Sequence, residues 1–144
     1  MKIINTKDIE EAKKQVKRQS NSIIKAQDDF FNRKILEQTK NITLLSPELG
    51  DRKDSLRQIN SGFNHILGKI ATKNNNSLAI DLKEISFLNK LEKAKRLSKI
   101  MQNINICKKT KTPIKIIIKR EKEAFHLLLS LKSSTEQAKK INEY

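Results

Sequence analysis

Apolar residues along this chain follow two periods, one typical of strands and one typical of helices, and the two alternate. Short runs rich in Ile and Leu predict strands at Lys2–Asn5, Ile23–Ala26, Ile42–Leu45, Leu78–Leu82 and Ile114–Ile118. Apolar positions three and four residues apart predict helices after Asp8, after Asp28 and Asp29, at Ser61–Lys73, Phe87–Lys109, Glu123–Leu131 and Ser134–Ile141. The order along the chain is therefore strand, helix, strand, helix.

This alternation predicts an α/β protein of about five βα units with a parallel sheet, either doubly wound or rolled toward a barrel. A chain of 144 residues fits a single domain, 1–144. A closed eight-unit barrel normally takes about 250 residues. Five units would leave an open, incomplete barrel, and we expect a partner or a second copy to cover its exposed strand edge.

The charge balance predicts a polyanionic partner. Lys and Arg number 31 against 16 Asp and Glu, a formal net charge of +15, and the residues after position 90 are the more cationic part. RNA, DNA and an anionic membrane all carry the opposite charge. Composition alone is the alternative, because lysine supplies most of the positive charge and the chain is also rich in Asn and Ile, as AT-rich coding would produce.

Cysteine usage and hydropathy predict a soluble cytoplasmic protein. Cys107 is the single cysteine, so no internal disulfide can form. No apolar stretch approaches the roughly 20 residues that span a bilayer, and the amino terminus has no signal-peptide pattern.

Catalytic, metal and cofactor motifs are not found in the sequence. His65 and His126 are far apart, Cys107 stands alone, and no ligand spacing indicates a metal site. Glycine occurs only at positions 50, 62 and 68, which allows neither a Rossmann fingerprint nor a P-loop. His65 could serve as a general base, but no nucleophile is identifiable beside it. We therefore predict no catalytic residue, no metal and no cofactor.

The stretch after the third predicted strand is the most informative. Arg52 and Lys53 lie in a loop, and Gly62 and Asn64 precede a helix that carries His65. A helix amino terminus offers free N–H groups and a partial positive charge, so such a loop suits a phosphate. The alternative is an ordinary solvated pair of basic side chains.

These residues resemble the family of ribonuclease P protein component 3, the thirty-kilodalton-type subunit of archaea and eukaryotes. The likeness covers most of the chain. It rests on Arg52-Lys53-Asp54, Ser61-Gly62, Asn64-His65, Lys69 and the strand Leu78–Leu82, and continues through Arg96, Met101, Asn103, Ile106, Cys107, Lys111, Pro113, Leu127–Leu131 and Ala138-Lys139. Two departures stand out: family members are longer by one or two βα units, and Lys119-Arg120-Glu121 replaces small residues.

The resemblance implies a TIM-barrel-like fold and a role as a subunit of an endoribonuclease holoenzyme that removes the 5′ leader from precursor tRNA. Catalysis there belongs to the RNA, and the chain alone is not catalytic. The implied partners are ribonuclease P RNA, precursor tRNA indirectly, and a ferredoxin-like protein subunit, with no membrane.

The predicted RNA contacts are Arg52, Lys53, His65 and Lys69, followed by Arg96 and Lys99 on the long helix, with Asn64 acting as a cap. Aromatic residues are too few for base stacking to dominate binding.

Two other classes of function remain open from the sequence. One is a basic interaction or regulatory protein whose charge reflects composition. The other is an independent metal-dependent phosphoesterase, which would need His and Asp ligands clustered at strand ends. A basic strand-end rim would favour the subunit, and a cluster of carboxylates and histidines would favour the phosphoesterase.

Overall fold

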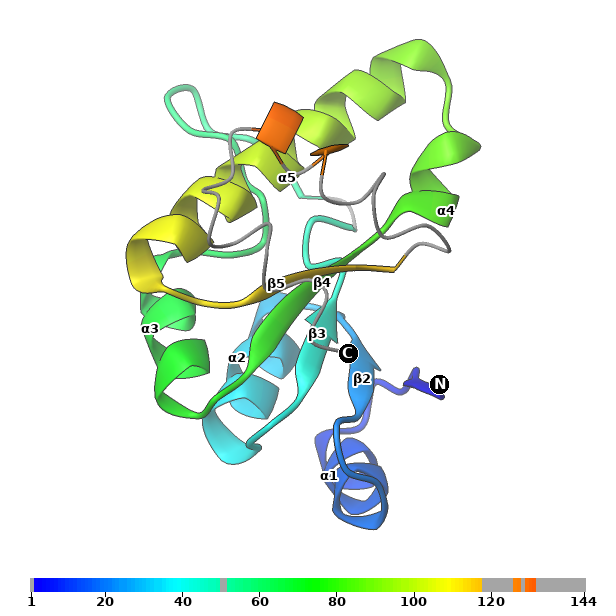
Figure 1. The fold of residues 1–144 in the computed structure, drawn as a ribbon, viewed down its shortest axis with the longest axis vertical. Helices are drawn as coiled ribbons and strands as arrows, with labels where there is room; N and C mark the ends of the chain where they lie inside the picture. The colour runs from blue at the N-terminus through cyan, green and yellow to red at the C-terminus, as the bar shows by residue number, and fades with distance from the viewer. Residues whose placement is uncertain (1, 50–51, 118–125, 128, 132–144) are drawn as a thin grey trace.

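A computed structural model describes residues 2–49, 52–117, 126–127 and 129–131. Five parallel strands form one sheet: β1 (Ile3–Ile4), β2 (Ile23–Lys25), β3 (Thr43–Leu45), β4 (Ser77–Asp81) and β5 (Ile114–Ile117). The helices are α1 (Ile9–Arg18), α2 (Asp29–Gln38), α3 (His65–Lys73), α4 (Leu82–Ser86) and α5 (Lys90–Thr110). The predicted parallel α/β architecture is confirmed (Figure 1).

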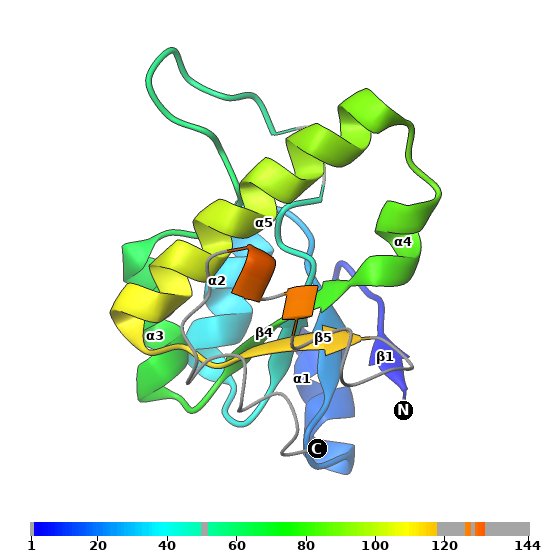
Figure 2. The same ribbon diagram turned by 45° about the horizontal axis from the view of Figure 1, so that its top comes forward.

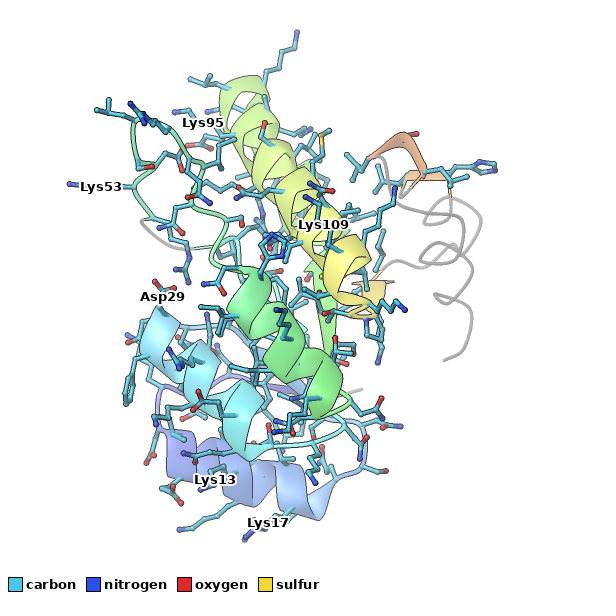
Figure 3. The ribbon with its side chains drawn as sticks, turned by 90° about the vertical axis from the view of Figure 1, so that its left-hand side faces the viewer. Lys13, Lys17, Asp29, Lys53, Lys95 and Lys109 are labelled. Carbon is cyan, nitrogen blue, oxygen red and sulfur yellow. The ribbon has the colours of Figure 1, made fainter. Side chains whose placement is uncertain are left out.

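The strands lie in the sheet in the same order as in the chain. A doubly wound sheet reverses its order part-way, so this sequential order is that of a shortened TIM-barrel-like fold, with the five described strands forming an open sheet. Figure 3 looks onto the helix layer, in which α1, α2, α3 and α5 follow one another across one face of the sheet.

Both faces of the sheet are apolar at its centre. One row of residues in register is almost fully buried and packs toward the helices: Ile4, Ile24, Leu44, Leu78 and Ile114. The opposite face carries a second cluster of Ile23, Leu45 and Ala79, with Ile117 packed against it. Strands buried on both faces explain why the sequence shows near-continuous apolar runs.

Asparagine or aspartate caps the start of each of the helices α1 to α5, and asparagine precedes several of the strands. Each N-cap side chain accepts a backbone N–H of the first turn: Asp8, Asp28, Asn64, Asp81 and Asn89. A left-handed residue then precedes each of the strands β2 to β5: Asn21, Asn41, Asn75 and Lys111. Asparagine tolerates that conformation better than most residues do. The sequence thus repeats the same two features along the fold: a polar cap at the start of a helix and a left-handed residue before the next strand.

The third predicted helix begins later than its pattern indicated. The prediction started it at Ser61, whereas α3 begins at His65, because Asn64 is extended and caps it. Phe63 is buried from the loop, and Ile66 is 61% exposed although it continues the apolar spacing. Phe63 and Ile66 therefore continue the apolar spacing of a helix, but neither lies on the buried face of α3. Phe63 precedes the helix, and the Ile66 side chain is exposed.

The helix predicted at Phe87–Lys109 is also wrong at its start. A short helix, α4, follows β4 directly, and α5 begins only at Lys90. Asp81 and Asn89 cap the two helices and separate them. Phe87, placed in the predicted helix, is 87% exposed between them.

The predicted helix at Ser134–Ile141 lies outside the described residues, as does most of Glu123–Leu131. Residues 126–127 and 129–130 are helical, and Leu131 donates its N–H to the Leu127 carbonyl at 2.9 Å. No helix in the described part of the chain is both long and apolar enough to cross a membrane.

Candidate nucleic-acid interface

The loop between β3 and α3 carries the residues that the sequence singled out. Figure 2 shows this segment projecting beside α5. Near its tip, Ser55 and Gln58 close a turn by exchanging backbone hydrogen bonds of 2.9 and 3.4 Å. At its base, the Asp54 carboxylate accepts the Asn60 N–H at 2.8 Å. Hydrogen bonds within the loop therefore stabilise both its tip and its base.

Arg52 fixes the start of this loop. Its Nε donates to the carbonyl oxygens of Pro47 at 3.1 Å and Leu49 at 3.3 Å, and one terminal nitrogen donates to that of Gln27 at 3.3 Å. The other terminal nitrogen pairs with the Asp29 carboxylate, and only 9% of the arginine side chain is exposed. The guanidinium thus has protein partners in most directions, and the structure places it as an anchor of the loop.

Gly62 is required beside that anchor. Its φ is +73°, and a Cβ there would lie 2.6 Å from Arg52 Nε and closer still to the Pro47 carbonyl oxygen. Such a contact is impossible without movement of the loop, and left-handed backbone is unfavourable for residues other than glycine. The Arg-Lys-Asp and Ser-Gly parts of the sequence motif are therefore in contact, since Arg52 packs against the space that Gly62 leaves.

Lys53, His65 and Lys69 are the predicted contact residues with exposed side chains. Lys53 borders a depression of ≈ 480 Å³ that the α3 amino terminus also lines. His65 and Lys69 lie one turn apart on α3 and so share a face of it. Asn64 accepts the Leu67 N–H at 2.9 Å, which confirms it as the cap of α3.

Arg96 lies in a buried ion-pair network at the carboxyl ends of the strands. It is 8% exposed, and its Nη2 lies 3.3 Å from the Glu48 carboxylate and 3.1 Å from that of Glu84. Lys25, the last residue of β2, lies 3.2 Å from Glu84. The network joins β2, the segment after β3, α4 and α5, so Arg96 connects elements of the protein rather than offering a free cation at the surface.

The two carboxylates of this network differ in acidity. Burial raises the pKa of Glu48 above its usual range, although the Arg96 charge opposes the rise. Burial also acts to raise the pKa of Glu84, but hydrogen bonds from Arg96 and Lys25 outweigh it and lower the pKa. Glu48 Oε2 has no hydrogen-bond partner among the described residues. Glu48 is therefore the carboxylate that takes up a proton first.

Lys99 is half-buried and donates to the Arg52 carbonyl oxygen at 3.4 Å. It links α5 to the start of the loop, so α5 supports the loop through this bond. Sequence reasoning missed the partners of the two arginines, which are Asp29, Glu48 and Glu84, and it missed Lys25, which pairs with Glu84. Acids and bases so far apart along the chain carry no pattern that pairs them.

Metal ligands and nucleophiles are the groups that an independent phosphoesterase would require. No group of three or more His, Cys, Asp or Glu side chains among the described residues is arranged to hold a metal ion. Cys107 is fully buried, and burial raises the pKa of its thiol far above the ordinary range. Among the described residues at the carboxyl ends of the strands, Glu48 and Glu84 pair with Arg96 and Lys25, and no ligand cluster of the kind that a phosphoesterase would need is present.

No family model matches the chain, and no curated protein matches it. Among solved structures, its fold matches a chain of a cryo-EM structure of archaeal ribonuclease P with mature tRNA, at a TM-score of 0.80 and 23% sequence identity. The match covers 98% of this chain and 63% of that chain. The likeness establishes a shared fold, and this chain spans less than two thirds of the protein that it resembles.

Proposed function

We propose that this chain is a protein subunit of a ribonuclease P, which supports a catalytic RNA in removing the 5′ leader from precursor tRNA. The observation that carries the proposal is the fold match to a chain of archaeal ribonuclease P across 98% of the sequence. The sequence motif gives separate support, because it rests on residue identities and spacing and not on the fold.

The anchoring of the loop adds a physical reason for the motif. Gly62 leaves the space in which the Arg52 side chain reaches the Pro47 carbonyl oxygen, so a chain with this loop conformation needs both residues. The motif is then the signature of a particular loop held over the carboxyl ends of the strands. We propose that its exposed members Lys53, His65 and Lys69 contact RNA, while Arg52, Asn64, Arg96 and Lys99 hold the elements that present them.

The proposed role is scaffolding, because catalysis in this family belongs to the RNA. A net charge of +15 lowers the electrostatic cost of compacting RNA. Following the family resemblance, the partners are ribonuclease P RNA and a ferredoxin-like protein subunit, with precursor tRNA reached through the complex.

The test is precursor-tRNA cleavage at low Mg²⁺ by the cognate ribonuclease P RNA. Four mixtures are compared: RNA alone, RNA with this protein, RNA with its ferredoxin-like partner, and RNA with both proteins. We expect cleavage to rise most when all components are present. No stimulation by this protein in any mixture, together with equal binding to unrelated RNAs, would favour the basic interaction protein instead.

A matched pair of variants tests the proposed contacts. Lys53→Gln/Lys69→Gln removes two exposed charges at the loop and α3, and Lys14→Gln/Lys17→Gln removes two exposed charges on α1. The first pair should raise the protein concentration needed for half-maximal stimulation several-fold, while the second leaves it near the wild-type value. Equal effects would mean that only total charge matters.

A further inference from the structure

The carboxyl-terminal ends of α3 and α5 meet in a tight polar joint. Gly68 lies against Thr110, where a Cβ on the glycine would be 2.6 Å from the threonine Oγ1. The Thr72 hydroxyl donates to the Thr110 carbonyl oxygen at 2.9 Å, and the Thr112 hydroxyl donates to that of Gly68 at 3.0 Å. These four residues, which we call the helix joint, hold the two helix ends in a fixed relation.

Lysines flank every residue of the helix joint. Each of the four is adjacent in sequence to a joint residue, and all four are exposed: Lys69, Lys73, Lys109 and Lys111, which we call the joint lysines. Lys109 is labelled on α5 in Figure 3. None of them forms an ion pair within the described part of the chain. The fixed joint thus gathers four uncompensated charges from two helices.

No acidic residue lies in the sequence around these helix ends. Between Ser55 and Ile80, and again between Lys93 and Ile117, Asp and Glu are absent. Helix α1 differs, because its basic residues follow Glu10 and Glu11, and Lys13 pairs with Glu10 at 3.0 Å. The joint lysines therefore form a local excess of positive charge that α1 lacks.

Helix dipoles do not account for four lysines. Each helix carboxyl terminus carries about half a negative charge, so the two ends together present about −1. The joint lysines supply four positive charges around the same place. A net excess of about +3 remains for an external anion.

The surroundings of the joint lysines favour the phosphate backbone of RNA over a membrane. Of the large exposed apolar residues in the described chain, Ile66 alone lies within one turn of a joint lysine, on the α3 face that carries Lys69. A helix that binds a membrane surface buries such side chains among the lipids. With no ring to stack on bases, contact would be with phosphates and insensitive to sequence.

We propose that the joint lysines form a docking surface for the phosphate backbone of structured RNA. The identity of that RNA as ribonuclease P RNA rests on the proposed function. The surface extends the single α3 contact at Lys69 into a bipartite site that includes the end of α5. Fixed spacing between the two helix ends favours a rigid, double-helical backbone over a flexible strand.

The experiment compares two full-length variants with equal loss of charge. K69Q/K73Q/K109Q/K111Q removes the joint lysines, and K13Q/K14Q/K17Q/R18Q removes four charges from α1. Binding to ribonuclease P RNA, to a generic RNA duplex and to phosphatidylserine-containing vesicles is measured across a salt series, with circular dichroism to confirm folding. Precursor-tRNA cleavage is measured with the same proteins.

Loss of the joint lysines should flatten the slope of log affinity against log salt by about 3, and should weaken RNA binding at least about tenfold at 0.1 M salt. The α1 variant should change the slope by less than half as much. Equal losses in both variants, no loss in either, or a loss confined to vesicles would each overturn the docking surface. Cleavage unaffected by any wild-type protein, with RNA binding still dependent on the joint lysines, would overturn the proposed function alone.

Discussion

Replacing Gly62 with alanine should disrupt the loop that follows β3. The new Cβ would stand 2.6 Å from Arg52 Nε and closer to the Pro47 carbonyl oxygen, at a φ of +73°. Left-handed backbone costs an alanine about 1–2 kcal/mol. Displacing the guanidinium from its carbonyl acceptors adds about 1–3 kcal/mol. We therefore expect G62A to lose roughly 2–5 kcal/mol in total.

Thermal unfolding followed by circular dichroism measures this loss. A chain of this size shifts its melting temperature by about 2–4 °C per kcal/mol, so G62A should melt about 10 °C lower. If the loop opens without global unfolding, limited proteolysis between residues 52 and 64 detects it instead. Asn21→Ala is the control for backbone strain alone, because Asn21 also has a positive φ of 55° but is exposed. Its effect should be about 1 kcal/mol.

A double-mutant cycle with Arg52→Ala separates the two causes. Arg52→Ala removes the Nε contact but leaves the Pro47 carbonyl and the φ of Gly62 as they are. The double variant should therefore lose less stability than the two single losses added together. The reasoning is refuted if G62A melts within 2 °C of wild type, roughly the shift of a sub-kcal/mol change, and its loop resists protease as the wild type does.

Three further changes have effects that follow from buried polar groups. Arg96→Met leaves Glu48 buried without its cation and should lower the free energy of unfolding by about 3–5 kcal/mol at pH 7. The loss of stability should be smaller at pH 5, because Glu48 can then take up a proton. Urea unfolding of the variant and the wild type at both pH values measures the difference. Burial lowers the pKa of Lys115 to about 8 from 10.5, so the folded state disfavours the charged form of this side chain. The free energy of unfolding should therefore rise as pH increases from 8 to 10.5. Lys115→Met should abolish that rise, which is worth about 1 kcal/mol after allowing for solvent screening. Asn76→Ala removes three hydrogen bonds, to the Ile42 N–H and two carbonyls of the α2 end, and should lower unfolding free energy by about 3 kcal/mol in denaturant melts.

Local patterns predicted the strands and the starts of α1 and α2, because those depend on neighbours in sequence. Apolar runs located the strands to within a residue or two, and the helix predicted after Asp28 and Asp29 is α2, with Asp28 as its cap. The errors came where a side chain continued the helical period from outside a buried face. Phe63 packs into the core from a loop, and Phe87 is exposed between two helices. Periodicity records spacing and cannot tell which side of the chain meets the core.

The candidate site was harder to predict because its charges pair over long sequence distances. Arg52 and Arg96 were expected to face RNA, but their partners Asp29 and Glu48 lie 23 and 48 residues away. Only the folded chain brings these groups together. The RNA-contact assignments of the whole set remain a prediction, which the charge-matched variants test.

Asparagine richness in this chain has a structural explanation that the lysine content lacks. Asn74 and Asn76 both donate to carbonyls at the end of α2, and Asn32 is fully buried while bonding both backbone groups of Gln27. These roles argue against coding bias as the whole cause of the asparagine content. Lysine content still has to be explained by a partner or by composition.

The two buried arginines and the exposed lysines have different roles in the described structure. This difference limits how the protein can recognise RNA. Arg52 and Arg96 use their planar, multi-donor side chains to bind several internal acceptors at once. The exposed cations around the α3 and α5 ends are lysines, which act on phosphate as point charges without bidentate base recognition. Binding through that surface should therefore fall steeply with salt and vary little with RNA sequence. Specificity for one RNA would then come from the shape of its folded backbone and from a second protein subunit.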